Sequence, residues 1–448
     1  MPCGGAVYGE DNLVFVANDW HVALLPVLLQ AHYRDHGQYQ YARSVLVLHN
    51  AAHQGRGPPS DADLFAVPAG ERRAAFDLDD PVGGKHSNIL KAGIEAAHRV
   101  VAVSRGYAWE VQTPEGGWGL HEALRHAAGS GKLAGIVNGI DSEEWSPSSD
   151  PFLVEEGGGE KFGYRRYSLA DFREGKAACK RALQRELGLP ERPDAPLLVF
   201  IGRLDHQKGV DLIVESAGWL ASQGAQLVML GSGRPDLEDA LRGLEGAHRD
   251  SVRWCVVGTF FRFVLSWDFD FLPFFEGGKK RKRKKNSNFF FPLHPLPPPP
   301  PKKKLQKNAP LQNNDSWVGF SIAMAHRATA AGDVLLMPSR FEPCGLNQLY
   351  ALNYGTVPLV HAVGGLRDTV APYDPFAEPD GAGTGWLFDR ADGGALRDAA
   401  SHALRTYRDF RESFDALARR GMEGAPERDW GAAAEAYENV LTEAKYVW

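Results

Sequence analysis

The fold is decided by residues 333–346, which read DVLLMPSRFEPCGL. The apolar run at 333–337 is typical of a buried strand, and a charged turn with a glycine joins it to a helical pattern at 346–354. In an open α/β sheet, ligands bind at the carboxyl ends of parallel strands, where helix N-termini point free N–H groups at anions. Glu342 would lie at that place, so we expect it to face a neutral or developing positive group beside a phosphate. A sugar fits that description.

The rest of the chain alternates strand-like and helical runs, which predicts an α/β fold with mostly parallel sheets. In the first half we predict a helix at 22–36 and strands at 13–17, 44–48, 100–103 and 135–137. In the second half we predict strands at 197–201, 226–230, 333–337 and 357–361, and helical regions at 177–187, 210–221, 235–244 and 394–448. Residues 146–175 lack a period and predict an exposed, mobile loop. These patterns indicate two domains, 1–190 and 191–448, with a cleft between them.

A strongly basic segment interrupts the second half. Residues at about 255–316 carry 12 Lys or Arg and 4 Asp or Glu, against 50 and 56 in the whole chain. The run KKRKRKK at 279–285 would also suit a nuclear-localisation or nucleic-acid patch. We favour a disordered insertion, because the ordered pattern resumes at Trp317 and a compact domain rarely holds so long a structureless loop.

Composition excludes several classes of partner and site. A net charge of -6 predicts no nucleic-acid partner. No apolar run reaches the roughly 18 to 20 residues that span a bilayer, so we expect no membrane association. The N-terminus lacks a signal or transit pattern. The four cysteines lie far apart without a CxxC pair, which predicts neither disulfides nor a metal site.

Two cations and two glycines mark a second strand-to-helix loop, residues 202–209, GRLDHQKG. Arg203 can clamp two phosphate oxygens with its planar fork, and Lys208 adds a mobile point charge, so together they could neutralise a diphosphate without a metal. The alternative is a solvated loop whose charges pair with nearby acids. Gly231, in the GSG turn after the next predicted strand, could also approach a phosphate, although such turns are common.

Polar groups also follow the first two predicted strands. Asp19 comes after the first strand and His49 after the second, which would place both at one edge of the sheet. Each alone is more often structural, since a histidine at a strand end usually bonds a backbone carbonyl. Trp118 and Trp145 could offer flat faces to sugar rings, but burial is the safer expectation for a tryptophan.

Taken together, residues 339–350, 202–209, 15–21, 49–55 and 137–141 resemble the starch synthases, family 5 of the glycosyltransferases. Residues 361–368, HAVGGLRD, and the ending AKYVW are most similar to the plant class II isoforms. The resemblance implies a GT-B fold with two Rossmann-like lobes and an interdomain cleft. It further implies retaining transfer of glucose from ADP-glucose to the non-reducing end of an α-1,4-glucan, without a cofactor, in a plastid. Other starch-synthesis enzymes are further candidate partners.

The resemblance also implies roles for individual residues. Arg203 and Lys208 would neutralise the diphosphate, and Glu342 would bind the glucose and stabilise positive charge at C1. His49 and Asp19 would face the donor sugar, and Asn138 would lie near the acceptor. The remaining donor-binding positions that it implies are Gly231, Phe320, Cys344, Gly345, Leu346 and Asn347.

The chain departs from the family pattern in two places. The family's Lys-x-Gly-Gly-Leu loop has no counterpart before Asn12, so we expect a truncated first lobe and a transit peptide missing from this chain. The basic segment separates Arg253-Trp254 from Trp317-Val318, as a retained intron would. A catalytically inactive remnant that binds glucan or nucleotide is therefore an alternative function. A GT-B transferase that uses UDP-sugars is a weaker one.

Overall fold

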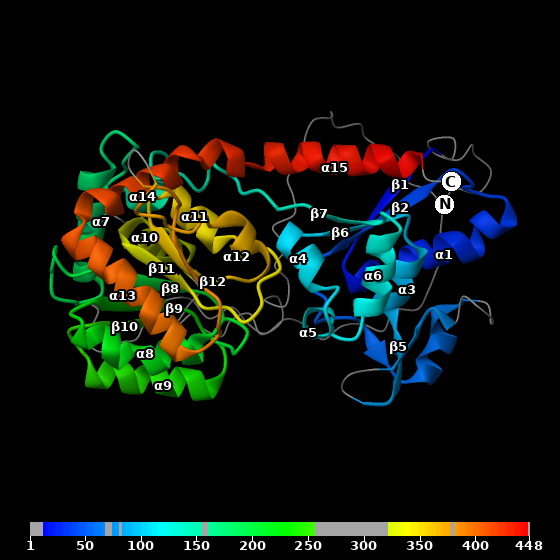
Figure 1. Ribbon diagram of the computed structural model, residues 1–448, viewed down its shortest axis with the longest axis horizontal. Helices are drawn as coiled ribbons and strands as arrows, with labels where there is room; N and C mark the ends of the chain where they lie inside the picture. Colours follow the sequence, from blue (N-terminus) through cyan, green and yellow to red (C-terminus); the bar gives the residue numbers. More distant parts are fainter. Residues whose placement is uncertain are drawn as a thin grey trace, which may run out of the picture.

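The computed structural model describes residues 12–67, 74–79, 83–154, 160–255, 321–377 and 381–446. They form two lobes, each built on a parallel β-sheet with helices packed against it (Figure 1). The predicted α/β class is confirmed. The predicted basic insertion lies outside the described residues except for Cys255, and Phe320 also lies outside them.

The first lobe contains a four-stranded parallel sheet in the order β1-β2-β6-β7. The central strand β2 is buried along its whole length, as expected where helices cover a parallel sheet. The strands are β1 (Val14–Asn18), β2 (Arg43–Leu48), β6 (Arg99–Ala102) and β7 (Leu133–Gly135). The helices are α1 (Leu24–His32), α3 (Ile89–Ala96), α4 (Arg105–Glu110), α5 (Pro114–Gly117) and α6 (His121–Gly129), with 3₁₀ turns at Trp20–Val22, Arg34–His36 and Pro59–Phe65. A small sheet that the sequence patterns missed consists of β3 (Arg56–Gly57), β5 (Lys85–Asn88) and β4 (Asp77–Asp79).

The second lobe contains six parallel strands in the order β10-β9-β8-β11-β12-β13. The chain winds outward from β8 to β10, then crosses to β11 and winds the other way, which is the strand order of a Rossmann fold. The strands are β8 (Leu197–Ile201), β9 (Gln226–Leu230), β10 (Val252–Cys255), β11 (Val334–Met337), β12 (Val357–His361) and β13 (Trp386–Phe388). The order reverses between β8 and β11, so the loops after these two strands border the place where such sheets bind ligands.

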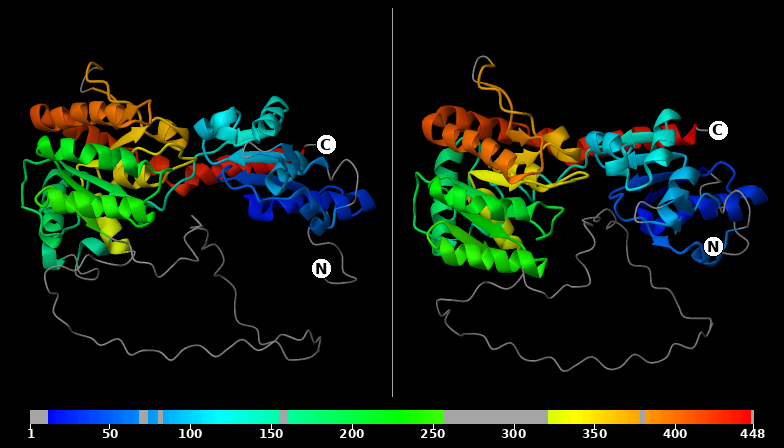
Figure 2. Two further views of the ribbon diagram at one scale, coloured as in Figure 1. Left: turned by 90° about the horizontal axis from the view of Figure 1, so that it is seen from below. Right: turned by 60° about the horizontal axis from the view of Figure 1, so that its bottom comes forward.

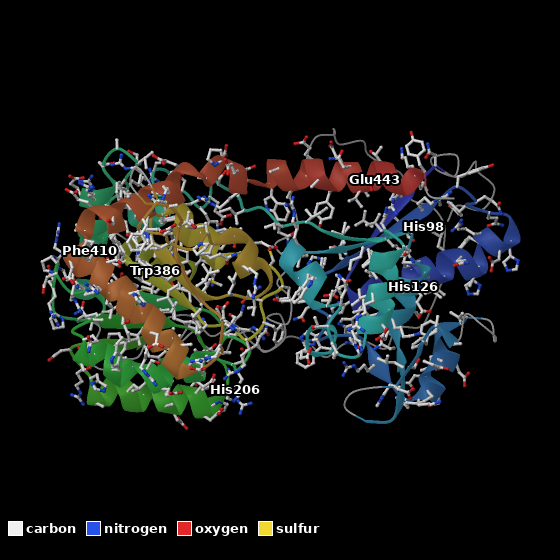
Figure 3. The ribbon with its side chains drawn as sticks, in the orientation of Figure 1. His98, His126, His206, Trp386, Phe410 and Glu443 are labelled. Carbon is white, nitrogen blue, oxygen red and sulfur yellow. The ribbon has the colours of Figure 1, made fainter. Side chains whose placement is uncertain are left out.

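The helices of the second lobe include one that returns to the first lobe. They are α7 (Phe172–Glu186), α8 (Val210–Ser222), α9 (Pro235–Ala247), α10 (Ile322–Ala331), α11 (Asn347–Asn353), α12 (Gly364–Thr369), α13 (Gly393–Asp409), α14 (Arg411–Glu423) and α15 (Trp430–Lys445), with 3₁₀ turns at Pro151–Leu153, Glu160–Phe162 and Ala425–Arg428. Helix α15 extends from the second lobe across the first (Figures 1 and 2). Its Val440 and Ala444 join the hydrophobic core of the first lobe. Glu443 lies above that lobe (Figure 3), with its carboxylate 3.6 Å from the Arg99 guanidinium.

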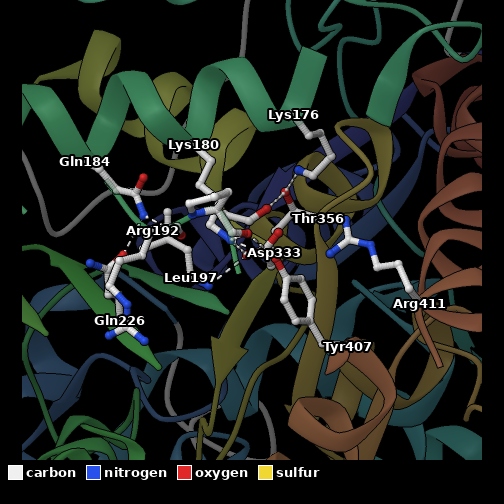
Figure 4. Close-up of polar contacts among 12 residues, drawn as sticks. Lys176, Lys180, Gln184, Arg192, Leu197, Gln226, Asp333, Thr356, Tyr407 and Arg411 are labelled. Atoms are coloured by element: carbon white, nitrogen blue, oxygen red, sulfur yellow. Dashed lines mark hydrogen bonds and ion pairs between the residues drawn. The ribbon is translucent and has the colours of Figure 1, made fainter. Parts of the chain in front are cut away.

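A buried polar network fixes α7 to the sheet of the second lobe (Figure 4). Lys180 Nζ lies 2.7 Å from Asp333 Oδ2 and 2.8 Å from the Tyr407 hydroxyl. The same Asp333 oxygen accepts a hydrogen bond from the Leu197 amide, so it also links β8 to β11. Lys176 donates to Thr356 Oγ1 at 2.7 Å, and burial lowers the pKa of its ammonium to about 8. Lys180 and Asp333 thus form a buried ion pair, and the Lys176 ammonium is satisfied by hydrogen bonds, as polar groups inside a core must be.

The predicted elements agree with the structure most closely where apolar strands are flanked by turns. The strands predicted at 197–201, 226–230 and 357–361 have the bounds of β8, β9 and β12. The helix predicted at 22–36 is regular only over α1, because 3₁₀ turns form its two ends and Gly37 adopts a left-handed conformation after the second. The strand predicted at 135–137 lies two residues earlier, at β7.

The exposed loop predicted at 146–175 is confirmed only in part among the residues that the structure describes: most of it is irregular and many positions are exposed, but several side chains are buried and its last residues belong to α7. Asp150 is fully buried, and the side chains of Leu153, Tyr164 and Tyr167 belong to the core of the second lobe. Single aromatic residues without a period can still be buried, and a periodicity argument does not detect them. The domain boundary near residue 190 stays a prediction. The core of the second lobe draws its residues from Leu153 to Met422, whereas Cys344 within that range and Val440 and Ala444 of α15 pack into the core of the first lobe.

Candidate active site

The centre of the candidate site is an ion pair between the loops that follow β8 and β11. Lys208 Nζ lies 2.8 Å from Glu342 Oε2, and the Ser339 hydroxyl donates a hydrogen bond to the same oxygen at 3.0 Å. Glu342 is 6% exposed, so its charge needs these partners. The two segments are far apart in sequence, and the reversal of strand order between β8 and β11 brings them together.

Glycine makes this close approach possible. Gly209 begins α8 with φ +68, and a Cβ on it would lie 2.0 Å from the Pro338 carbonyl oxygen at the end of β11. Next to it, Arg340 donates two hydrogen bonds to Asp211, at 2.8 and 2.7 Å. The Arg340 amide also donates to the Gln207 carbonyl at 2.7 Å. The two loops are therefore locked to each other, which fixes the Lys208–Glu342 pair.

Arg203 lies at the exposed side of the same loop. Its side chain is 49% exposed, and its guanidinium contacts Asp205 at 3.1 Å and Gln207 at 3.0 Å. His206, three residues along, lies on the side of the second lobe that faces the first (Figure 3). Arg203 thus lies close in sequence to the buried Lys208–Glu342 pair, but its guanidinium faces solvent and could bind a diphosphate.

Gly231 has a packing role. A Cβ on it would lie 1.9 Å from the Gly202 carbonyl oxygen, so the turn after β9 fits against the Arg203 loop only as glycine. Gly233 approaches Leu204 in the same way, at 2.3 Å from its carbonyl oxygen. The turn that contains Gly231 and Gly233 therefore packs against the backbone of the Arg203 loop, whether or not it contacts a ligand.

The residues after Glu342 connect the site to both lobes. Gly345 has φ +71, and the Asn347 side chain donates to the Ile201 carbonyl at 2.7 Å, which fixes the start of α11 to the end of β8. Cys344 and Leu346 pack into the hydrophobic core of the first lobe. Burial raises the pKa of the Cys344 thiol to about 12, so this cysteine is a packing residue and no thiolate.

The predicted residues of the first lobe meet at the ends of β1 and β2. Asp19 is 6% exposed and has φ +62, and its carboxylate accepts hydrogen bonds from the Trp20 and Asn50 amides. Burial raises the pKa of Asp19 to about 7. His49 Nε2 lies 3.0 Å from Asn18 Oδ1. A non-glycine residue with positive φ costs of order 1–3 kcal/mol, and such strain is typical of functional sites.

Asn138 and two tryptophans lie at or near the junction of the lobes. The Asn138 backbone contacts the Cys344 thiol, so the predicted acceptor residue is adjacent to the Glu342 loop. Trp118 has φ +51, is 39% exposed, and contacts the Phe341 ring edge-on at 5.6 Å. Trp145 stacks on the rings of His326 and Tyr350 at 3.8 Å each, so the alternative that it offers a free face to sugar is wrong.

Several site residues were missed by the sequence argument. Ser339 and Arg340 lie inside the stretch that decides the fold, so their position next to Glu342 was a signal that could have been used. Asp211 and Glu110 gave no signal, because each accepts hydrogen bonds from a residue far away in the sequence, Arg340 for Asp211 and Gly364 for Glu110.

Among the described residues there is no group of three or more His, Cys, Asp or Glu side chains that could hold a metal ion. In the same parts of the chain, no helix has the length and apolarity needed to cross a bilayer.

The sequence matches two family models. Residues 7–126 match the starch synthase catalytic domain, and residues 300–420 match the group 1 glycosyl transferases. The chain is 50% identical over 447 residues to soluble starch synthase 2-2 of Oryza sativa subsp. japonica, covering 100% of this chain and 54% of that protein. It is 50% identical over 448 residues to starch synthase 2 of Arabidopsis thaliana, covering 100% and 47%. The chain thus spans about half the length of the relatives it matches.

A solved structure agrees with the fold. The catalytic domain of starch synthase IV from Arabidopsis thaliana, bound to ADP and acarbose, superposes with a TM-score of 0.72 at 27% identity, covering 96% of this chain and 73% of that one. The predicted GT-B arrangement of two Rossmann-like lobes is confirmed. Similarity to the class II isoforms is confirmed as well. Along its whole length the chain is thus similar to starch synthases, with one region that matches the starch synthase catalytic domain and another that matches the group 1 glycosyl transferases.

Proposed function

We propose that this chain transfers glucose, with retention, from ADP-glucose to the non-reducing end of an α-1,4-glucan and releases ADP. The observation that carries the proposal is the Lys208–Glu342 pair at the point where the strand order of the second sheet reverses. A cation for phosphate and an acid for sugar lie side by side there. The relatives are named as starch synthases, and the solved starch synthase IV domain is named as bound to ADP and acarbose.

The chemistry follows from these charges. Arg203 and Lys208 would neutralise the diphosphate as its bond to glucose breaks, which stabilises the leaving group electrostatically. When the diphosphate pairs with the Lys208 ammonium, the Glu342 carboxylate is free to stabilise the positive charge that develops at C1 of the glucose. The backbone N–H groups at Gly345, Leu346 and Asn347 would meet the distal phosphate at the start of α11. No protein nucleophile is required if the acceptor hydroxyl attacks from the face that the phosphate leaves.

The first lobe would hold the sugars. Asp19 and His49, at the ends of β1 and β2, would contact the donor glucose, and Asn138 at the lobe junction would contact the acceptor glucan. The relatives are named as chloroplastic or amyloplastic proteins, so we place the activity in a plastid. Association with other starch-synthesis enzymes is part of the same proposal.

Binding without transfer is the second candidate function. It is favoured by one observation: Arg203, Lys208 and Glu342 all come from the second lobe, so nucleotide binding needs only that lobe. The test incubates the whole chain with amylopectin and either labelled ADP-glucose or labelled UDP-glucose, and titrates ADP in a calorimeter. Label in glucan from ADP-glucose supports transfer. ADP binding without label supports the second function, and label mainly from UDP-glucose supports a UDP-sugar transferase.

A further inference from the structure

Helix α4 of the first lobe is hydrogen-bonded to the second lobe at three points. The Ser104 hydroxyl donates to the Pro343 carbonyl at 2.6 Å, and the Gly106 amide donates to Asp368 Oδ2 at 2.7 Å. The Glu110 carboxylate accepts a hydrogen bond from the Gly364 amide at 2.7 Å. Helices α4 and α12 lie side by side in all views (Figures 1 and 2). One short helix therefore contacts both the segment after Glu342 and α12, at Gly364 in the first turn of α12 and at Asp368.

That turn supports the backbone of Glu342. The Gly365 amide donates to the Glu342 carbonyl oxygen at 3.0 Å. Gly364 has φ +43, and a Cβ on it would lie only 2.1 Å from the same oxygen. The Gly364–Gly365 turn and the Glu342 backbone are thus in direct contact, and a movement of one must move the other.

Glu110 is the charged member of this contact. It is half-buried at the lobe junction, where burial raises the pKa of its carboxyl by more than the hydrogen bond from the Gly364 amide and the charges of Arg367 and His361 lower it. A hydrogen bond between a carboxylate and a backbone N–H in such a place is stronger than a neutral one. Gly106, one helical turn before, adds a steric constraint, since a Cβ on it would lie 2.6 Å from the Gly364 carbonyl oxygen.

We propose that Glu110 is a positioning residue that couples closure of the two lobes to the placement of Glu342. The proposal rests on the transfer function proposed above. With the lobes together, the Glu110 carboxylate accepts the hydrogen bond from the Gly364 amide, the Gly365 amide donates to the Glu342 carbonyl, and the Glu342 side chain lies beside Lys208. When the lobes separate, the Glu110–Gly364 bond is lost and the turn that supports Glu342 is released. Glu342 is then ready to act only in the closed state.

The kinetic test compares Glu110→Ala and Glu110→Gln with the matched control Glu122→Gln, an exposed glutamate of the same lobe. Loss of a charge-assisted hydrogen bond predicts that Glu110→Ala lowers kcat about 10-fold to 100-fold. The KM for ADP-glucose should change less than about 2-fold, because the diphosphate cations lie elsewhere. Glu110→Gln keeps an acceptor oxygen and should recover most of kcat. Equal loss in the Gln and Ala variants, or an unchanged kcat in Glu110→Ala, would overturn the proposal.

A second measurement does not depend on turnover. Amide hydrogen exchange at Gly364 and Gly365 should be slow in the wild-type chain and at least about 10-fold faster in Glu110→Ala, with Glu122→Gln unchanged. Unchanged exchange at both glycines overturns the positioning role even if the chain is active. Faster exchange in a chain that transfers no glucose would reject the proposed function and keep the mechanical link.

Discussion

The pair formed by Lys208 and Glu342 can be tested by a double-mutant cycle. Lys208→Met removes the ammonium and leaves the buried Glu342 carboxylate with a hydrogen bond from the Ser339 hydroxyl. Glu342→Gln removes the charge but keeps a similar shape. In the double variant neither charge remains, so the penalty for an unpaired buried charge disappears.

The magnitude follows from the exposure of the two side chains. Breaking a fully buried ion pair from one side costs about 3–5 kcal/mol. The Lys208 side chain is 19% exposed and that of Glu342 is 8% exposed, so solvent screens part of the effect. We expect Lys208→Met to lower the free energy of unfolding by about 2 kcal/mol, and the double variant to recover about half of that.

Urea unfolding of the four proteins at pH 7 measures the cycle, with Arg203→Met as a matched control. The Arg203 side chain is 49% exposed and pairs with Asp205 at 3.1 Å, so its removal should change stability by less than about 0.5 kcal/mol. If the effects of Lys208→Met and Glu342→Gln add to within about 0.5 kcal/mol, the two groups are uncoupled and the site geometry is refuted.

Three further perturbations test other parts of the structure. Burial raises the pKa of Asp19 from 3.8 to about 7, so the folded protein favours the neutral carboxyl. The contribution of Asp19 to the free energy of unfolding is therefore fully present below about pH 4 and is lost as the pH rises through about 7. Asp19→Asn should therefore gain stability relative to wild type between pH 4 and pH 8, by up to about 4 kcal/mol in chemical unfolding; a pH-independent difference would contradict this. Gly209→Ala should lower the Tm, because Gly209 has φ +68 and the added Cβ would lie 2.0 Å from the Pro338 carbonyl oxygen. The control Gly243→Ala, in α9 with open space around it, should raise the free energy of unfolding by about 1 kcal/mol. Equal shifts in the two variants would exclude the close contact at Gly209. Burial raises the pKa of Cys179 to about 11 and of Cys255 and Cys344 to about 12, so these three thiols should react with an aromatic disulfide reagent only after unfolding; rapid labelling of Cys344 in the native protein would show that the lobe junction is open.

The features that were predicted correctly are those that depend on the residue pattern of a short stretch of sequence. Strands β8, β9 and β12 have apolar β-type runs between turns, and their bounds were found to the residue. The stretch containing Glu342 and the loop containing Lys208 could be placed at one edge of a sheet because parallel strands align their carboxyl ends. These two predictions were sufficient to bring the acid and the cation together.

Other features depend on contacts between distant segments and leave no local trace. The Glu110 carboxylate meets Gly364 across the lobes, and nothing near either residue in the chain indicates the other. Tyr167 is buried because its ring and hydroxyl fit the second lobe, although its neighbours are polar. Asp19 has φ +62, a backbone conformation that its residue type, which predicts only a turn, does not indicate.

The most direct test of the proposed function is transfer of labelled glucose from ADP-glucose to amylopectin by the wild-type chain and by Glu342→Gln, measured side by side. The glutamine variant keeps the shape of the site and the loop contacts but lacks the charge that would stabilise the sugar as its bond breaks. We predict that the wild-type chain incorporates label and that Glu342→Gln is slower by about 10²- to 10³-fold. Equal rates in the two proteins, or no label in glucan with the wild-type chain, would contradict the assignment of glucosyl transfer to this site.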